Sequence, residues 1–202
     1  TTVVNLLTRF YDIDGGSITL DGESIYDIPK KKLRGSIGIV LQDTVIFNDT
    51  IMQNIRYGRL DATDEEVIAA AKTAKVADFA EKMADGYDTM LTEGGGNLSQ
   101  GQRQLIAIAR AVLADPKILI LDEATSSIDT RTEVHIQEAM LALMKGRTSL
   151  IIAHRLSTIR DADKIVVIDG GKVVEAGNHE KLLSENGAYA RLYNTQFAGI
   201  KT

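Results

Sequence analysis

Cysteine and tryptophan are absent from this 202-residue sequence, and proline occurs only twice. The lack of cysteine excludes disulfide bonds and thiolate metal sites and fits a reducing compartment. No run of about 18 apolar residues occurs, so no segment has the length and character of a membrane-spanning helix. Lysine and arginine total 23 against 28 acidic residues, a net charge of −5 that provides no broad basic surface for nucleic acid or anionic lipid. Any polyanion must therefore be bound locally.

The composition that remains is that of an ordinary globular domain. Apolar residues make up 44% of the chain and charged residues 25%, which excludes wholesale disorder and fibrous repeats. The length fits one large domain, residues 1–202. The sequence opens on Thr1-Thr2 rather than Met and runs directly into an apolar helical pattern. This start predicts a fragment cut inside an element.

Short apolar stretches alternate with helical patterns along the chain. Residues 37–41, 118–121 and 149–153 are apolar at successive positions, as expected of strands buried on both faces of a parallel sheet. Capping-box pairs predict helices that begin after them: Thr63 with Glu66, Ser99 with Gln102, and Thr130 with Glu133.

The order of these patterns predicts an α/β fold. A parallel sheet forms its core, and a helical subdomain at about residues 50–115 is inserted between strands. Residues 164–175, with a Gly-Gly turn, predict a hairpin that adds an antiparallel β portion.

Each of the most apolar predicted strands is followed by a residue capable of chemistry. These residues are Gln42, the pair Asp122-Glu123, and His154. Ligands of open α/β sheets bind outside the carboxyl ends of the strands, so we expect the four residues to share one crevice. Asp122 is suited to bind a hard cation such as Mg²⁺, and Glu123 to orient or deprotonate a water. The alternative is that each polar side chain merely meets solvent.

A second candidate site lies at the predicted helix start that follows a run of three glycines. Residues 98–102, Leu-Ser-Gln-Gly-Gln, offer a hydroxyl, a glycine that permits close backbone approach, and the free N–H groups of a helix N-terminus. These groups together favour an anion site. A simple helix cap is the alternative.

Four ordered motifs resemble the ATP-binding domain of ABC transporters, and the resemblance extends over essentially the whole chain. The motifs are VLQD at 40–43, LSQGQRQ at 98–104, ILILDEATSSID at 118–129 and IIAHRLSTI at 151–159. The resemblance implies a P-loop NTPase-like fold and the hydrolysis of ATP with Mg²⁺ as cofactor. It also implies that Asp122 and Gln42 bind the metal and the ATP, that Glu123 acts as general base, and that His154 contacts the γ-phosphate.

The resemblance further implies a head-to-tail dimer with a second nucleotide-binding domain, identical or different. Ser99, Gln100, Gly101 and Gln102 would contact ATP held by that partner, and Asp129 would couple the two sites. Gln100 stands where the family more often has glycine.

The family's phosphate-binding loop, G-x-x-x-x-G-K-[ST], does not occur in the sequence. Thr1-Thr2 resembles the end of that loop, with Thr1 as the Mg²⁺-binding hydroxyl and Thr2 beside the phosphates. The first strand and most of the loop are thus expected upstream. The fragment alone is expected to bind ATP weakly and to hydrolyse little or none.

Three stretches resemble exporters in particular: residues 47–58, the TEGGGN sequence at 92–97 and the HRLSTI sequence at 154–159. This resemblance implies ATP-powered export and a cytoplasmic position at the membrane. It also implies a transmembrane domain upstream in the same chain, whose coupling helices would face residues 47–58. The alternatives are a soluble ABC-type ATPase acting on nucleic acid and a non-catalytic dimerisation fragment. No basic extension supports the nucleic-acid alternative, so no nucleic-acid partner is expected.

Overall fold

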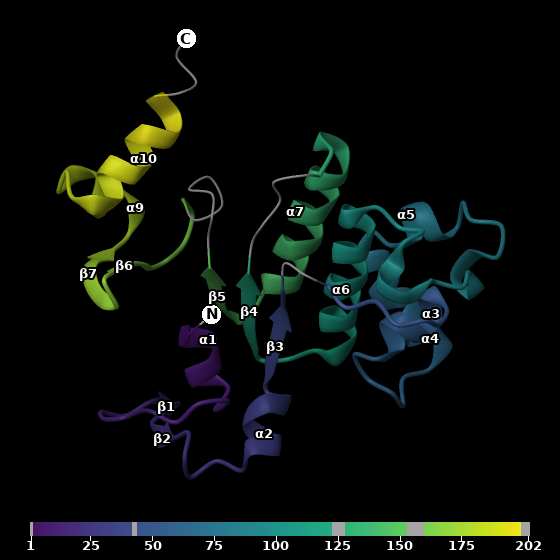
Figure 1. Ribbon diagram of the computed structural model, residues 1–202, viewed down its shortest axis with the longest axis horizontal. Helices are drawn as coiled ribbons and strands as arrows, with labels where there is room; N and C mark the ends of the chain where they lie inside the picture. The colour runs from purple at the N-terminus through teal and green to yellow at the C-terminus, as the bar shows by residue number, and fades with distance from the viewer. Residues whose placement is uncertain (1, 42–43, 123–127, 153–159, 199–202) are drawn as a thin grey trace. The chain divides into compact units, whose positions relative to one another are not determined.

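A computed structural model describes residues 2–41, 44–122, 128–152 and 160–198 (Figure 1). The chain divides into two compact units, residues 1–152 and 153–202. Within the described residues, no helix combines the length and the apolar character that crossing a membrane requires.

The first unit begins with a small layer of helices and a two-stranded antiparallel ladder: α1 (Thr2–Leu7), β1 (Thr19–Leu20), β2 (Glu23–Ser24) and α2 (Lys30–Gly35). Helix α1 ends at Leu7, and Arg9, two residues later, adopts a left-handed conformation with φ of 53° that does not continue the helix. The Arg34 Nε donates to the carbonyl oxygen of Thr8 at 3.0 Å, which ties the end of α1 to α2.

A three-stranded parallel sheet forms the centre of this unit, as predicted. Its strands lie in the order β3 (Ile37–Val40), β4 (Ile118–Asp122) and β5 (Thr148–Ile152). Val40 is opposite Leu121, Leu121 is opposite Ile151, and Asp122 is opposite Ile152. The side chains of Leu119 to Leu121 are fully buried, which explains the continuous apolar run of β4.

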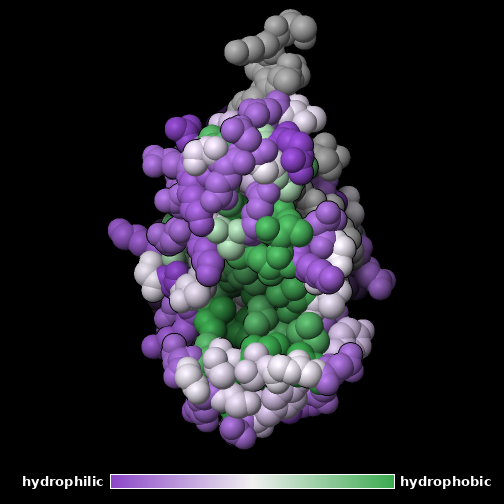
Figure 2. All heavy atoms as spheres, turned by 90° about the vertical axis from the view of Figure 1, so that its left-hand side faces the viewer, coloured by the Kyte–Doolittle hydropathy of each residue, from purple (hydrophilic) through white to green (hydrophobic). Residues whose placement is uncertain are grey.

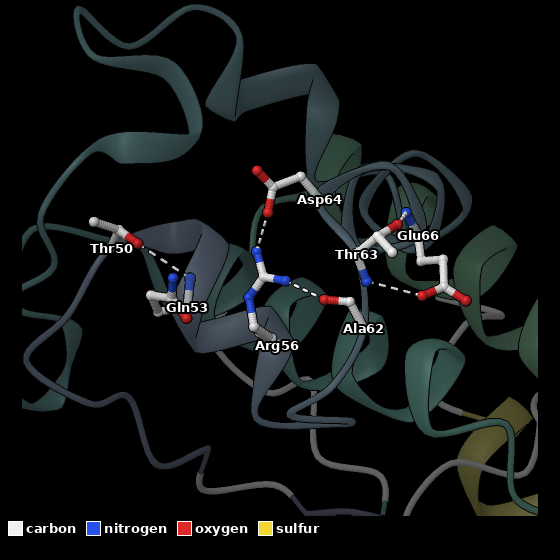
Figure 3. Close-up of polar contacts among 7 residues, drawn as sticks. All are labelled: Thr50, Gln53, Arg56, Ala62, Thr63, Asp64 and Glu66. Carbon is white, nitrogen blue, oxygen red and sulfur yellow. Dashed lines mark hydrogen bonds and ion pairs between the residues drawn. The ribbon is translucent and has the colours of Figure 1, made fainter.

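All described elements between β3 and β4 are helical: α3 (Ile51–Arg56), α4 (Asp64–Thr73), α5 (Ala77–Ala80), the 3-10 helices η1 (Gly86–Asp88) and η2 (Glu93–Gly95), and α6 (Gln100–Ala114). Figure 3 shows how side chains fix two of them. The Thr50 Oγ1 accepts from the Gln53 N–H at 3.1 Å, and Thr63 and Glu66 form the predicted capping box. Arg56, from α3, donates to the carbonyl oxygen of Ala62 and pairs with Asp64 at the start of α4.

Helix α7 (Thr130–Met144) packs against α6. Its N-cap is Asp129, one residue before the predicted Thr130, so the predicted Thr130–Glu133 capping box was wrong. The Asp129 Oδ1 accepts from the Thr132 N–H at 3.0 Å. An aspartate carboxylate is among the best N-caps, which explains why the helix starts there.

The second unit contains a β-hairpin followed by two helices: β6 (Ile165–Asp169), β7 (Lys172–Gly177), α9 (His179–Ser184) and α10 (Ala188–Ala198). Gly170 and Gly171 both have positive φ, as the predicted tight turn requires. The Glu175 carboxylate accepts from the backbone N–H groups of Ala188 and Tyr189 and so fixes the start of α10 against the hairpin.

Candidate functional site

The register of the parallel sheet brings the ends of its three strands to one edge. Asp122 is the last residue of β4 and lies opposite Ile152, the last residue of β5, while β3 ends at Val40, one position earlier along the shared register. The chain continues from these ends to Gln42, Glu123 and His154, which lie outside the described residues. The three strands that precede these residues thus end at one edge, and the convergence of the residues themselves stays a prediction.

Of the predicted site residues at this edge, Asp122 lies within the part of the chain that the structure describes. Its side chain is half-buried, directly after three fully buried apolar residues. A carboxylate in this position can present oxygen to a hard cation such as Mg²⁺. Thr2 is exposed at the start of α1, and within the described part of the chain it forms no hydrogen bond with the other candidates. Thr1 lies outside that part.

The start of α6 is fixed by a reciprocal pair of hydrogen bonds, as predicted. The Ser99 Oγ accepts from the Gln102 N–H at 3.2 Å, and the Gln102 Oε1 accepts from the Ser99 N–H at 2.9 Å. Ser99 is exposed, and Gln100 follows it as the first helical residue, half-buried. The capping box therefore holds the hydroxyl and the first turn of α6 in place, and these are groups of the kind that can bind phosphate.

Gly101 is buried where α6 meets α7. A Cβ at this position would overlap the Cγ2 of Thr132 and would lie 3.2 Å from the Cγ2 of Ile128. Glycine is therefore required here by packing between the two helix starts. The same contact brings the Ser99 segment next to Asp129, which caps α7.

Asp129 carries an ionised carboxylate at neutral pH. Hydrogen bonds from the backbone and side chain of Thr132 lower the pKa of this carboxyl. Asp129 is exposed, so its charge is available to a partner as well as to the cap.

Sequence reasoning missed a network centred on Asn54, a fully buried residue of α3. The Asn54 Oδ1 accepts from the Phe47 N–H at 2.9 Å, and the Nδ2 donates to the carbonyl oxygens of Phe47 and Thr50, both at 3.0 Å. One amide thus fixes the loop that follows the Gln42 segment. A single polar residue inside a helical pattern gave no signal of this role.

Arg110 connects this loop to α6, the helix that begins after Ser99. Its Nε donates to the Asn54 carbonyl oxygen at 2.5 Å, its Nη2 to the Asn54 Oδ1 at 2.7 Å, and its Nη1 to the Val45 carbonyl oxygen at 2.6 Å. Burial lowers the pKa of the guanidinium, which remains charged at neutral pH. The Arg110 carbonyl also leaves no room for a Cβ at Gly58, so α3 and α6 are in close contact.

The surface of this network is aromatic. Phe47 and Tyr57 stack with ring centroids 4.1 Å apart and are 38% and 48% exposed, and the Arg110 guanidinium lies over the Phe47 ring at 5.2 Å. Exposed aromatic rings that are held in place by Asn54 and Arg110 are suited to contact another protein segment.

Comparison with known proteins places these features in a family. Residues 1–126 match the family model described as ABC transporter. The chain is 58% identical over 98% of its length to the uncharacterised ABC transporter ATP-binding protein YfiC of Bacillus subtilis. It is 55% identical, also over 98% of its length, to an ATP-dependent lipid A-core flippase of Hahella chejuensis. The chain spans about a third of the length of each, 33% and 34%.

A solved structure agrees with this comparison. The structure of a bacterial Atm1-family ABC exporter with ATP bound matches 96% of this chain with a TM-score of 0.90 and 49% identity. The match covers 34% of the exporter chain. The similarity therefore concerns one part of a larger protein.

Proposed function

This chain belongs to the ABC transporter family, and from this premise we propose that it is the ATP-binding domain of an exporter that uses ATP hydrolysis to drive transport across a membrane. The observation that carries the proposal is the shared edge of the three parallel strands, where Asp122 ends β4 and from which the chain runs to Gln42, Glu123 and His154. The relatives named ABC transporter ATP-binding protein and ATP-dependent flippase support it.

In this proposal the strand ends carry the chemistry. Asp122 and Gln42, with Thr1, would hold Mg²⁺, which would neutralise charge on the phosphates. Glu123 would orient or deprotonate the attacking water, and His154 would contact the γ-phosphate. The half-buried carboxylate of Asp122, the donor type that Mg²⁺ prefers, supports the metal assignment.

The start of α6 would bind the ATP of a second domain. Ser99, Gln100, Gly101 and Gln102 carry hydroxyl, amide and backbone groups that recognise phosphate, and the capping box holds them in position. Asp129, whose segment touches Gly101, would couple the two sites. The second domain is either another copy of this chain or a related one, in a head-to-tail arrangement.

The aromatic surface of Phe47 and Tyr57 would contact the transmembrane part of the exporter, which we place upstream in the same chain at the cytoplasmic face of the membrane. The exposure of the stacked rings and their support by Arg110 and Asn54 favour this role. Through Arg110, movement at this surface would reach the helix that begins after Ser99.

We also propose that residues 1–202 form one ATP-binding domain, with a helical subdomain at about 50–115, that is completed by a first strand and the phosphate-binding loop. Leu150 of β5 is 37% exposed, although it lies in the middle of a strand. Figure 2 shows apolar side chains gathered in the middle of the face that it presents, with polar side chains around them. A further strand beside β5 would help to cover the exposed side chain of Leu150.

The test is ATP hydrolysis by the complete protein that carries this sequence. The Glu123→Gln variant should lower turnover at least about 100-fold and still bind Mg-ATP, because only proton transfer or water orientation is lost. Glu81→Gln, a matched change of an exposed glutamate after α5, should leave turnover unchanged. Near-native hydrolysis by Glu123→Gln would refute the role of Glu123, and no hydrolysis by the native protein would favour the non-catalytic alternative.

A further inference from the structure

A pocket of about 420 Å³ lies where α5 and the residues on either side of it meet α6 and α7. Its volume falls in the range of small-molecule sites. Of the residues assigned above to ATP, only Gln102 borders it, and the Gln102 Oε1 is already engaged by the Ser99 N–H. The proposed ATP chemistry therefore does not account for this pocket.

The charged groups around the pocket are mainly cationic. Lys75, Lys82 and Arg131 line it against a single carboxylate, Asp78. In a chain with a net charge of −5, this local excess of positive charge is the reverse of the overall balance. An anion is therefore the ligand type that the charges favour.

Among the residues that the structure describes, two of the cations have no ion-pair partner. Lys75 pairs with Glu138 of α7 at 3.1 Å, and the His135 Nδ1 lies 3.8 Å from Asp78. Lys82 and Arg131 form no ion pair with any residue that the structure describes, and both are exposed. Lys75 is thus paired with Glu138, whereas the charges of Lys82 and Arg131 have no ion-pair partner among the described residues.

The pocket also has an apolar wall. Phe79 of α5 is half-buried and Leu105 of α6 is almost fully buried. Thr132, from the first turn of α7, adds a hydroxyl to the lining. Cations beside an aromatic ring and a hydroxyl suit a ligand that has a charged end and an apolar body.

We propose that this pocket binds a small phosphorylated organic molecule. Its phosphate lies between Lys82 and Arg131, and its aromatic or apolar body packs on Phe79. Because the ligand contacts both the α5 segment and the start of α7, its binding fixes these two elements relative to each other. The site is separate from the proposed ATP chemistry, so either proposal can fail alone.

Lysine acetylation footprinting of the complete protein, free of nucleotide, tests the site directly. Phenyl phosphate should slow acetylation of Lys82 at least about threefold near saturation, since a bound ligand shields the amine in proportion to occupancy. Lys72 is the internal control, because it is exposed on α4 and does not line the pocket. Inorganic phosphate should protect Lys82 less, and benzyl alcohol should not protect it.

Arg131→Ala should abolish the protection of Lys82 by phenyl phosphate, whereas the matched Lys72→Ala should retain it. Equal slowing at Lys72 and Lys82 would show a general effect of ionic strength and overturn the proposal. Protection of Lys82 by ATP but not by phenyl phosphate would assign the pocket to the ATP site and overturn it as well. Equal protection by phenyl phosphate and inorganic phosphate would refute the role of Phe79.

Discussion

The start of α6 and the carboxyl edge of the sheet carry different kinds of chemical group. At the helix start, Ser99 and the residues after it offer a hydroxyl, a glycine and amides, held by a capping box and by packing against α7. These groups recognise phosphate but cannot accept a proton near neutral pH. The strand ends lead instead to carboxylates and an imidazole: Asp122, Glu123 and His154. In the proposed mechanism, phosphate recognition and proton chemistry are thus assigned to separate parts of the domain.

The largest effect is expected from a substitution of Ser99 at the start of α6. Ser99→Arg should place a bulky cation in the space of the partner's γ-phosphate, removing both ATP-dependent association and hydrolysis, with turnover down at least about 100-fold. Ser184→Arg, a matched change of an exposed serine in α9, should have no effect on either. Cross-linking with and without Mg-ATP measures this association. If the Ser99→Arg variant still associates when Mg-ATP is added, the proposed role of Ser99 is wrong.

A substitution of Arg110 tests whether its hydrogen bonds, which connect α6 to the loop that carries Phe47, stabilise the fold. Arg110→Ala should lower the free energy of unfolding by about 2 to 3 kcal/mol, because the hydrogen bonds from its charged guanidinium to the oxygens of Asn54 and Val45 are lost. The exposed pair of Arg59 and Glu66 provides the control, and Arg59→Ala should cost less than about 1 kcal/mol. Equal losses in denaturant unfolding would mean that the buried network contributes no more than a surface ion pair.

The N-cap of α7 should contribute less to stability than Arg110 does. Asp129→Ala should lower the stability measured by denaturant unfolding, whereas Asp129→Asn should retain most of it because asparagine also caps helices. If Asp129 in addition couples the two ATP sites, Asp129→Asn should still reduce hydrolysis despite its near-native stability. If Asp129→Asn hydrolyses ATP at the native rate, Asp129 only caps the helix and does not couple the two sites.

The smallest effect expected is a loss of stability in acid. Hydrogen bonds to backbone N–H groups lower the pKa of Asp129, Glu66 and Glu175 below their ordinary values of 3.8 and 4.5. A lowered pKa in the folded state means that this stabilisation is complete above those values and is lost as pH falls through the folded pKa. Denaturant unfolding between neutral pH and about pH 3 should therefore show falling stability, less so in Asp129→Asn. An increase in stability as the pH falls would contradict the predicted direction of this pH dependence.

Sequence patterns predicted the features that depend on neighbouring residues. The parallel strands follow from continuous apolar runs, and the boxes at Thr63 and Ser99 follow from residues three positions apart. The third box was wrong because Asp129, one residue earlier, caps better than Thr130. The bonds between Arg110 and Asn54 join residues 56 positions apart, and no local pattern reports such a contact.

The most direct measurement co-expresses two inactive copies of the complete protein, one with Glu123→Gln and one with Ser99→Arg. In a head-to-tail dimer, one of the two composite sites then has a native strand edge from one copy and a native Ser99 from the other. We predict that purified mixed dimers recover ATP hydrolysis that neither variant shows alone. Mixed dimers as inactive as the single variants would contradict the claim that Ser99 and Glu123 act on the same ATP from different domains.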